Sequence, residues 1–367
     1  MKVFLSLGER SASNYIYHIF KDVEGLELYG ITDERLEAIG VKSVARIEDL
    51  SVVGIAEALP KIPLVYKLWK KIERLAPQMD AFVLCDAPAF NLPLLKRIRR
   101  HAKKVIYFIS PQVWAWKEGR AELISKLVDH LVVILPFEVE FYRKYAREGF
   151  RVHFVGHPLV DLAKPSLTQE EFKKLIGFPS YLALLPGSRW SEIKRHTPYL
   201  REVLECLKPE LPLLVPTFEP FRAHIERELR AFPLRVITPQ DVDAPSYNTM
   251  AYADFTLLAS GTAELEASLL NAPHAVFYRV SPLTYLVGKL LVKVRYIALT
   301  NLILGRLVVP EFVQRPPWEL CAKLKELLSL QEKKEGMRAH FGELRAMLGQ
   351  EGAVKRLREL FLKLFYE

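Results

Sequence analysis

The chain has 367 residues, of which 50% are hydrophobic and 26% are charged. This composition excludes a disordered chain, and the length exceeds what one hydrophobic core usually spans, so we expect two domains. The formal net charge of +9 favours anionic partners, namely nucleic acid, acidic lipid or phosphorylated substrates, and does not choose among them.

The three cysteines, Cys85, Cys206 and Cys321, lie far apart in the sequence. Their spacing matches neither a zinc motif nor a disulfide framework, which predicts reduced thiols in a reducing compartment. The first hydrophobic run is too short for a signal peptide, and no stretch approaches the roughly 20 apolar residues of a transmembrane helix. We therefore expect a cytoplasmic protein.

The first half alternates short apolar runs with helical segments, a pattern typical of parallel βαβ units. Ligands of parallel sheets bind at the carboxyl ends of the strands, so the loop that follows the first strand, residues 8–13, is a candidate site. Asp86 directly follows a later strand, where it could act as a general base. The alternatives are that residues 8–13 form an ordinary βα turn and that Asp86 only stabilises a turn. Strands are predicted at residues 3–7, 26–31, 81–85, 105–109, 131–135 and 152–155.

Residues 50–75 combine Val, Ile, Leu and Trp with several lysines and an arginine. Apolar bulk with a basic rim is typical of a segment in a membrane interface, although a core helix with a solvated charged face has the same pattern. A second segment of this character follows residue 280. Trp114 and Trp116 come directly after a predicted strand, where they either line a site or pack in the core.

Residues 164–179 predict a linker, and the strand–helix pattern then restarts. The strand at 181–185 leads into Gly187, Ser188 and Arg189, a turn whose guanidinium suits a phosphate. Further strands are predicted at 213–216, 235–238, 255–259 and 275–279.

The strand at 255–259 leads into Ser260, Gly261 and Thr262, with Thr262 as the expected N-cap of a helix. Unpaired N–H groups at a helix N-terminus suit an anion. Glu266 lies one helical turn further, where a carboxylate could accept hydrogen bonds from sugar hydroxyls. An ordinary strand–turn–helix is the alternative. No P-loop, GxGxxG, HExxH or GxSxG motif occurs in the sequence, which argues against a P-loop kinase, a simple hydrolase and a zinc protease.

Several motifs together resemble those of lipid A disaccharide synthases. They are SPQVWAW at 110–116, VGHPLVD at 155–161, LLPGSR at 184–189, ASGTAELEA at 259–267, YRVSPLTY at 278–285 and NLILGRLVVPEF at 301–312. The resemblance implies an α/β protein of GT-B type, with two Rossmann-like domains whose parallel sheets face a central cleft. On this basis we expect an acceptor-binding, membrane-facing domain at 1–163, the linker at 164–179, a UDP-sugar-binding domain at 180–340 and C-terminal helices at 341–367.

The resemblance implies an inverting glycosyltransferase that needs no metal or other cofactor. It would join UDP-2,3-diacylglucosamine to 2,3-diacylglucosamine 1-phosphate, form the β-1,6 disaccharide and release UDP. The implied catalytic residues are Asp86 as the base, Arg189 at the leaving pyrophosphate and Glu9 as a helper. The implied UDP-binding residues are Gly187, Ser188, Arg189, Ser260, Gly261, Thr262, Glu266 and Asn301. The residues expected to face the acceptor or lipid are Ser11, Asn91, Trp114, Trp116, Leu64 and Trp69.

Both implied substrates carry acyl chains, so we expect peripheral association with the anionic inner-membrane surface. A homodimer is compatible with the sequence, and nucleic acid is not expected, because neither an aromatic RNA platform nor a recognition helix is evident. The alternative functions are a UDP-GlcNAc 2-epimerase and a glycosyltransferase with another acceptor.

The chain departs from the family pattern in its first loop, which usually reads Gly-Glu-x-Ser-Gly-Asp. Here Ala12 and Ser13 replace the last Gly and the Asp, and Ala89 replaces an Asp after Asp86. These losses favour Asp86 as the base.

Overall fold

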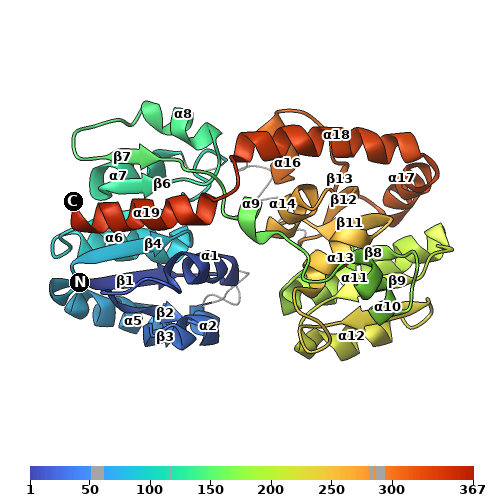
Figure 1. Ribbon diagram of the computed structural model, residues 1–367, viewed down its shortest axis with the longest axis horizontal. Coiled ribbons are helices and arrows are strands. Elements are labelled where there is room, and N and C mark those ends of the chain that lie inside the picture. Colours follow the sequence, from blue (N-terminus) through green and yellow to red (C-terminus); the bar gives the residue numbers. More distant parts are fainter. Residues whose placement is uncertain (51–61, 116–117, 282–284, 286–293) are drawn as a thin grey trace. The chain divides into compact units, whose positions relative to one another are not determined.

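The computed structural model describes residues 1–50, 62–115, 118–281, 285 and 294–367, which form two compact units (Figure 1). Unit 1 comprises Met1–Pro158 and Leu348–Glu367, and unit 2 comprises Leu159–Met347. The division thus falls after Pro158, a few residues before the expected boundary at 163. The end of the chain belongs to unit 1 and does not stand apart as a set of C-terminal helices.

Unit 1 is built on a seven-stranded parallel sheet in the order β3-β2-β1-β4-β5-β6-β7. Its central strands are continuous apolar runs, as expected for a sheet with both faces covered; all five residues of β4 are buried. The strands are β1 Lys2–Leu7, β2 Glu27–Thr32, β3 Lys42–Arg46, β4 Ala81–Cys85, β5 Val105–Phe108, β6 His130–Val132 and β7 Arg151–His153. The helical elements are α1 Arg10–Phe20, α2 Glu34–Ala38, α3 Ile47–Leu50, α5 Ile62–Leu75, η2 Ala76–Gln78, α6 Pro88–Ile98, α7 Gly119–Leu127, α8 Phe137–Arg143 and α19 Ala353–Tyr366.

The C-terminal helix α19 completes the core of unit 1. Its buried residues Leu357, Phe361 and Leu364 recur at helical spacing and form one apolar face. The ring of Phe361 lies 5.5 Å from those of both Phe20 in α1 and Phe108 in β5. This packing explains why the last twenty residues join the first unit.

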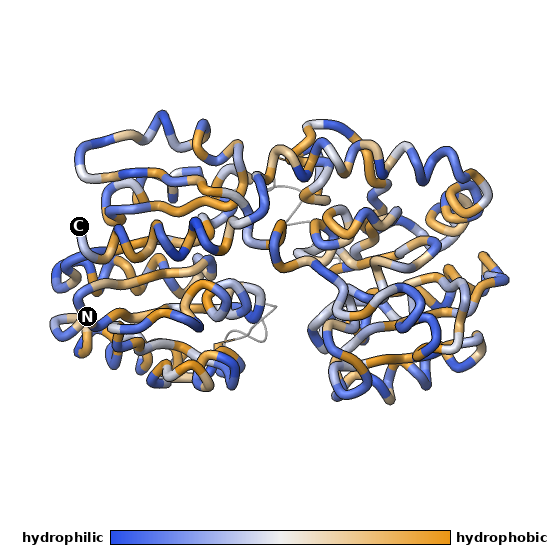
Figure 2. Tube along the Cα trace, in the orientation of Figure 1, coloured by the Kyte–Doolittle hydropathy of each residue, from blue (hydrophilic) through white to orange (hydrophobic). Residues whose placement is uncertain are grey.

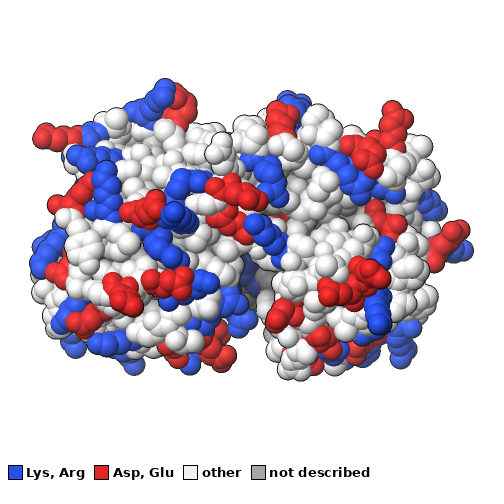
Figure 3. Space-filling model, viewed as in Figure 1, with Lys and Arg blue, Asp and Glu red and all other residues white. Residues whose placement is uncertain are grey.

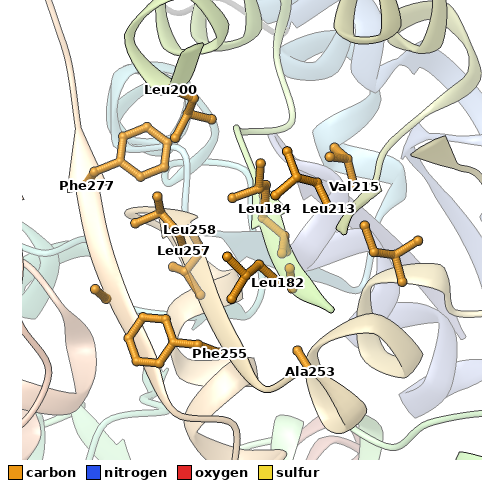
Figure 4. Packing of buried hydrophobic residues seen from close by; sticks show 14 of the residues in the cluster. Leu182, Leu184, Leu200, Leu213, Val215, Ala253, Phe255, Leu257, Leu258 and Phe277 are labelled. Atoms are coloured by element: carbon orange, nitrogen blue, oxygen red, sulfur yellow. The ribbon is translucent and has the colours of Figure 1, made fainter. Parts of the chain in front are cut away.

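Unit 2 is built on a six-stranded parallel sheet in the order β10-β9-β8-β11-β12-β13. Leu184 and Leu213 from the strands pack with Phe277 and with Leu200 of α11 in its core (Figure 4). The strands are β8 Leu182–Leu185, β9 Leu213–Pro216, β10 Leu234–Ile237, β11 Phe255–Ala259, β12 His274–Tyr278 and β13 Glu311–Val313. The helical elements are α9 Leu159–Leu162, α10 Gln169–Ile176, α11 Trp190–Leu207, η3 Glu219–Phe221, α12 Arg222–Glu228, α13 Pro245–Tyr252, α14 Thr262–Leu269, α16 Leu299–Leu304, α17 Pro317–Ser329 and α18 Gln331–Leu348.

A disulfide joins Cys206 of α11 to Cys321 of α17, with 6.1 Å between the Cα atoms. The prediction that the cysteines are reduced thiols is therefore wrong for these two, while Cys85 is a buried free thiol. The spacing could not reveal the pair, because the two cysteines are 115 residues apart in the sequence and come together only through the packing of α11 against α17.

Charged and polar residues are distributed over the surfaces of both units. Hydrophobic and hydrophilic residues alternate along α18 and α19 (Figure 2). On the face shown in Figure 3, basic and acidic side chains are interspersed on both units. Among the helices described, none is long and apolar enough to cross a membrane. Of the two segments predicted to lie in a membrane interface, residues 51–61 and nearly all of 282–293 are outside the described residues.

Candidate functional site

The two turns predicted to bind phosphate follow neighbouring strands of unit 2. β8 and β11 are adjacent, and Leu185 pairs with Leu258, so the turns at 186–189 and 260–262 emerge side by side (Figure 1). The chain leaves β8 toward β9 and leaves β11 toward β12, on opposite sides of this pair. Such a switch point is where open parallel sheets bind ligands at the carboxyl ends of their strands.

The turn after β8 is shaped around Glu192, a residue that the sequence analysis missed. Gly187 has φ +127°, and a Cβ on it would lie 2.7 Å from the Cβ of Glu192. Oε2 of Glu192 accepts a hydrogen bond from the N–H of Ser188 at 3.0 Å. The Arg189 guanidinium lies 3.6 Å from Oε1 of Glu192, and its side chain is 40% exposed. Glu192 therefore fixes the backbone of this turn, and the guanidinium of Arg189 is accessible to solvent.

The turn after β11 opens helix α14. Gly261, not Thr262, is the N-cap, and Thr262 is the first helical residue. The predicted N-cap was wrong by one position because Gly261 has φ +154°, which residues with a Cβ rarely adopt. Gly261 is exposed, so the N-terminal N–H groups of α14 and their positive dipole end lie next to solvent.

Glu266 lies one turn inside α14 and is half-buried. Burial raises its pKa to about 7, and a hydrogen bond from the Tyr247 hydroxyl at 3.0 Å opposes this rise. A carboxyl group with this pKa exchanges its proton near neutrality and can accept hydrogen bonds from hydroxyl groups of a ligand when ionised.

Asn301 is fully buried and its amide is used within its own loop. Its Nδ2 donates to the carbonyl of Val309 at 2.7 Å and to Glu311 at 2.8 Å, and its Oδ1 accepts from the N–H groups of Val308 and Val309. The motif resemblance predicts that Asn301 contacts UDP, whereas in the structure its amide holds the loop before β13.

Unit 1 has a corresponding switch point between β1 and β4. Leu7 pairs with Cys85, so Gly8 and Glu9 emerge beside Asp86. Three non-glycine residues here have left-handed backbones, namely Asp86 (φ +42°), Ala87 (φ +45°) and, after β5, Ile109 (φ +61°). Such conformations cost about 1–3 kcal/mol each and cluster at functional sites. This strain supports the choice of the loop after β4 as a site.

Buried groups hold the Asp86 loop in this conformation. The carbonyl of Asp86 accepts hydrogen bonds from the Tyr107 hydroxyl at 2.6 Å and from Nδ2 of Asn91 at 2.9 Å. Asn91 also donates to the carbonyl of Cys85 and accepts from Ser6. Asn91 is fully buried, so it positions Asp86 and does not face an acceptor as predicted. The Asp86 residue itself is partly exposed.

Trp114 donates its indole N–H to Oε1 of Glu138 at 3.2 Å. Glu138 is buried, and this burial raises its pKa to about 8, although it also accepts a hydrogen bond from the Leu135 N–H. Glu138 does not stand out in the sequence, because only its burial distinguishes it from other acids on helices. Trp116 lies outside the described residues.

Helix α1 carries the altered first loop. Glu9 is its N-cap residue, and Ser11, in the first turn, is partly exposed. Ala12 is buried, and the buried Ser13 donates a hydrogen bond to Asp33 at 2.6 Å. The position where the family pattern has an Asp is thus occupied by a hydroxyl bound to a carboxylate from the next loop.

Helix α5 presents apolar and basic side chains together. Leu64 is 45% exposed, whereas Trp69 is partly buried and donates to the carbonyl of Phe90 in α6. Trp69 therefore packs against α6, while the first turn of α5 is exposed to solvent. An open pocket of about 410 Å³ on this helix is lined by Lys67, Lys70, Lys71, Arg74 and Leu75.

Two α/β units, each built on a parallel sheet, form the GT-B fold, which is shared by glycosyltransferases and epimerases. A UDP-GlcNAc 2-epimerase from Neisseria meningitidis, solved with UDP-GlcNAc, has this fold, with a TM-score of 0.67 and 15% identity over 99% of this chain and 100% of that chain. MurG of Acinetobacter baumannii superposes with a TM-score of 0.55 at 12% identity over 99% of both chains. At these identities the likeness shows the fold alone.

The sequence comparisons identify the family. A family model described as Lipid-A-disaccharide synthetase matches residues 3–365. The lipid-A-disaccharide synthase of Aquifex aeolicus is 47% identical over 99% of both chains, and that of Persephonella marina is 37% identical over 99% of both chains. The chain belongs to the lipid-A-disaccharide synthase family, and it is a glycosyltransferase of lipid A biosynthesis.

Proposed function

We propose that the chain transfers 2,3-diacylglucosamine from its UDP derivative to the 6-hydroxyl of 2,3-diacylglucosamine 1-phosphate, with inversion at the anomeric carbon. The observation that carries this proposal is the side-by-side emergence of the 186–189 and 260–262 turns at the switch point of unit 2. One supplies a partly exposed guanidinium and the other the N-terminus of α14.

In the proposed reaction, negative charge builds on the pyrophosphate as its bond to the sugar breaks. Arg189 and the first N–H groups of α14 stabilise that charge, which is the largest electrostatic contribution expected in such a transfer. Glu266 accepts hydrogen bonds from the ribose hydroxyls of UDP. The UDP-sugar is the substrate, and this scheme uses neither a metal nor another cofactor.

Asp86 is the proposed general base. Its carboxylate takes the proton of the acceptor 6-hydroxyl while the oxygen attacks the anomeric carbon, and UDP leaves from the opposite face. The support is its place at the switch point of unit 1 and the strained backbone that buried Tyr107 and Asn91 hold there. Glu9, which follows the neighbouring strand β1, is proposed to assist Asp86.

The acyl chains of both substrates require contact with the inner-membrane surface. The exposed residues Ile62, Leu64 and Tyr66 precede the basic side chains that line the α5 pocket, which supports α5 as the contact. Apolar residues beside lysines and arginines bind an anionic lipid surface by burial and charge together.

The test is an assay of UDP release with both acylated glucosamine substrates, with the disaccharide identified by mass spectrometry. Each substrate alone serves as a control. The proposal expects UDP and disaccharide in equal amounts, only when both substrates are present. Conversion of UDP-GlcNAc to its 2-epimer without an acceptor would support the alternative function, an epimerase of the same fold.

A further inference from the structure

Glu192 contacts two separate parts of unit 2, the turn after β8 and the end of β12. It is the third residue of α11 and is only 7% exposed. Its carboxylate accepts hydrogen bonds from the N–H of Ser188 at 3.0 Å and from the Tyr278 hydroxyl at 3.2 Å, and it lies 3.6 Å from the Arg189 guanidinium. One buried carboxylate thus joins the turn after β8, including its arginine, to the end of β12.

His196, one helical turn further along α11, reinforces the same connection. It is fully buried. Its Nδ1 lies 2.6 Å from the carbonyl oxygen of Pro186, and its Nε2 lies 3.2 Å from both the backbone nitrogen and the carbonyl oxygen of Arg279. The Pro186 carbonyl can only accept, so Nδ1 carries a proton. Burial lowers the His196 pKa, and the hydrogen bonds to the backbone oppose this shift. The i, i+4 pair Glu192 and His196 therefore binds the start of the β8 turn to the segment after β12.

The space beside Gly187 shows that the turn is built around this carboxylate. A Cβ on Gly187 would lie 2.7 Å from both the Cβ and Oε2 of Glu192, and the backbone there has φ +127°. An acid in the first turn of a helix also stabilises the helix without any part in ligand binding. That structural role needs only the hydrogen bond between Glu192 and the Ser188 N–H. It does not explain why the Glu192 carboxylate also lies close to the Arg189 guanidinium.

We propose that Glu192 is a positioning residue that orients Arg189 and the Ser188 N–H toward the pyrophosphate of the UDP-sugar. This inference rests on the proposed function, since it assigns the anion to the same turn. The carboxylate does not touch the ligand; it limits the directions that the guanidinium can take, so less freedom is lost when the pyrophosphate binds.

The test is a double-mutant cycle on UDP affinity, measured by isothermal titration calorimetry with the full chain. Glu192→Gln keeps the shape and hydrogen-bond acceptor but removes the charge that holds Arg189. We expect it to raise the Kd for UDP about tenfold in the wild-type background and less than about threefold with Arg189→Ala, because interacting residues are not additive. Glu205→Gln, on an exposed position of the same helix near Arg201, is the matched control and should leave Kd unchanged.

A second variant guards against a folding defect. Tyr278→Phe removes the hydroxyl that donates a hydrogen bond to Glu192 and keeps both Glu192 and Arg189. We expect it to raise the Kd and the KM for the UDP-sugar by about two- to threefold with an unchanged melting temperature. Equal, additive effects of Glu192→Gln in both backgrounds would overturn the positioning role. Tighter UDP binding by Glu192→Gln would also overturn it, because the carboxylate would then compete with the pyrophosphate. Absence of UDP binding by the wild type would instead refute the proposed function itself.

Discussion

Gly8 shows how one missing side chain shapes the site in unit 1. A Cβ on Gly8 would lie 2.3 Å from the Cβ of Ala87, whose backbone is left-handed and directly follows Asp86. We expect Gly8→Ala to displace this loop, lower turnover and reduce the free energy of unfolding by about 1–3 kcal/mol. Urea unfolding and the UDP-release assay measure the two effects. Gly119→Ala, where a Cβ meets open space, is the control; equal behaviour of both variants would contradict this account.

Asp86 and Arg189 carry the chemistry in the proposed mechanism. Asp86→Asn removes the proton acceptor, and Arg189→Ala removes the charge at the leaving pyrophosphate. We expect each to lower turnover by roughly 10²–10⁴-fold, since base catalysis and charge stabilisation each contribute about that much. Circular dichroism should show an intact fold for both. A variant with wild-type turnover would exclude its residue from the mechanism.

At the scale of elements, the disulfide joins the C-terminal end of α11 to α17 within unit 2. It closes a loop of about 115 residues, for which restriction of the unfolded chain predicts a stabilisation of up to about 4–5 kcal/mol. We expect Cys206→Ser to lower the urea midpoint under oxidising conditions and to abolish the effect of dithiothreitol. A wild-type midpoint that is the same with and without dithiothreitol would show that the bond does not contribute.

Prediction from the sequence succeeded for elements whose signal is local. The buried runs that form β4, β9 and β11 were predicted with their observed bounds, because parallel strands covered on both faces are continuously apolar. The edge strand β3 was not predicted, since its KSVAR sequence is mostly polar and partly exposed. The three-residue strand β13 is too short to give a pattern.

The candidate site could be predicted only in part, because only some of its residues give a signal in the local sequence. The turns with Gly187 and Gly261 follow apolar runs and stand out in the sequence. Asn91 and Asn301 resemble ligand-binding residues in the sequence, but their amides serve the adjacent backbone. Glu138 and Glu192 were missed because burial and long-range partners distinguish them from other helical acids.

At the scale of the whole molecule, two buried groups with opposite pKa shifts contribute to how the free energy of unfolding depends on pH. Burial lowers the pKa of His157 to about 3, so the stability it contributes is lost as pH falls from about 6.5. Burial raises the pKa of Glu138 to about 8, so its protonated form favours folding below pH 8, and that contribution is lost as pH rises from about 4.5. The two contributions offset each other on acidification.

Glu138→Gln separates these contributions, because glutamine replaces the neutral acid without titrating. We expect the variant to lose stability relative to the wild type as pH falls from 8 to 5, by about 3 kcal/mol over that range. Urea unfolding of both proteins at several pH values measures the difference. Parallel pH profiles for the two proteins would contradict the assignment of a raised pKa to Glu138.

The central claim is that the two turns at the switch point of unit 2 hold the pyrophosphate of UDP. A crystal structure of the protein grown with UDP tests it most directly. We predict electron density for the two phosphates within hydrogen-bond distance of Arg189 and of the N–H groups that follow Gly261. Density for UDP elsewhere, or these turns left without nucleotide at saturating UDP, would contradict the claim.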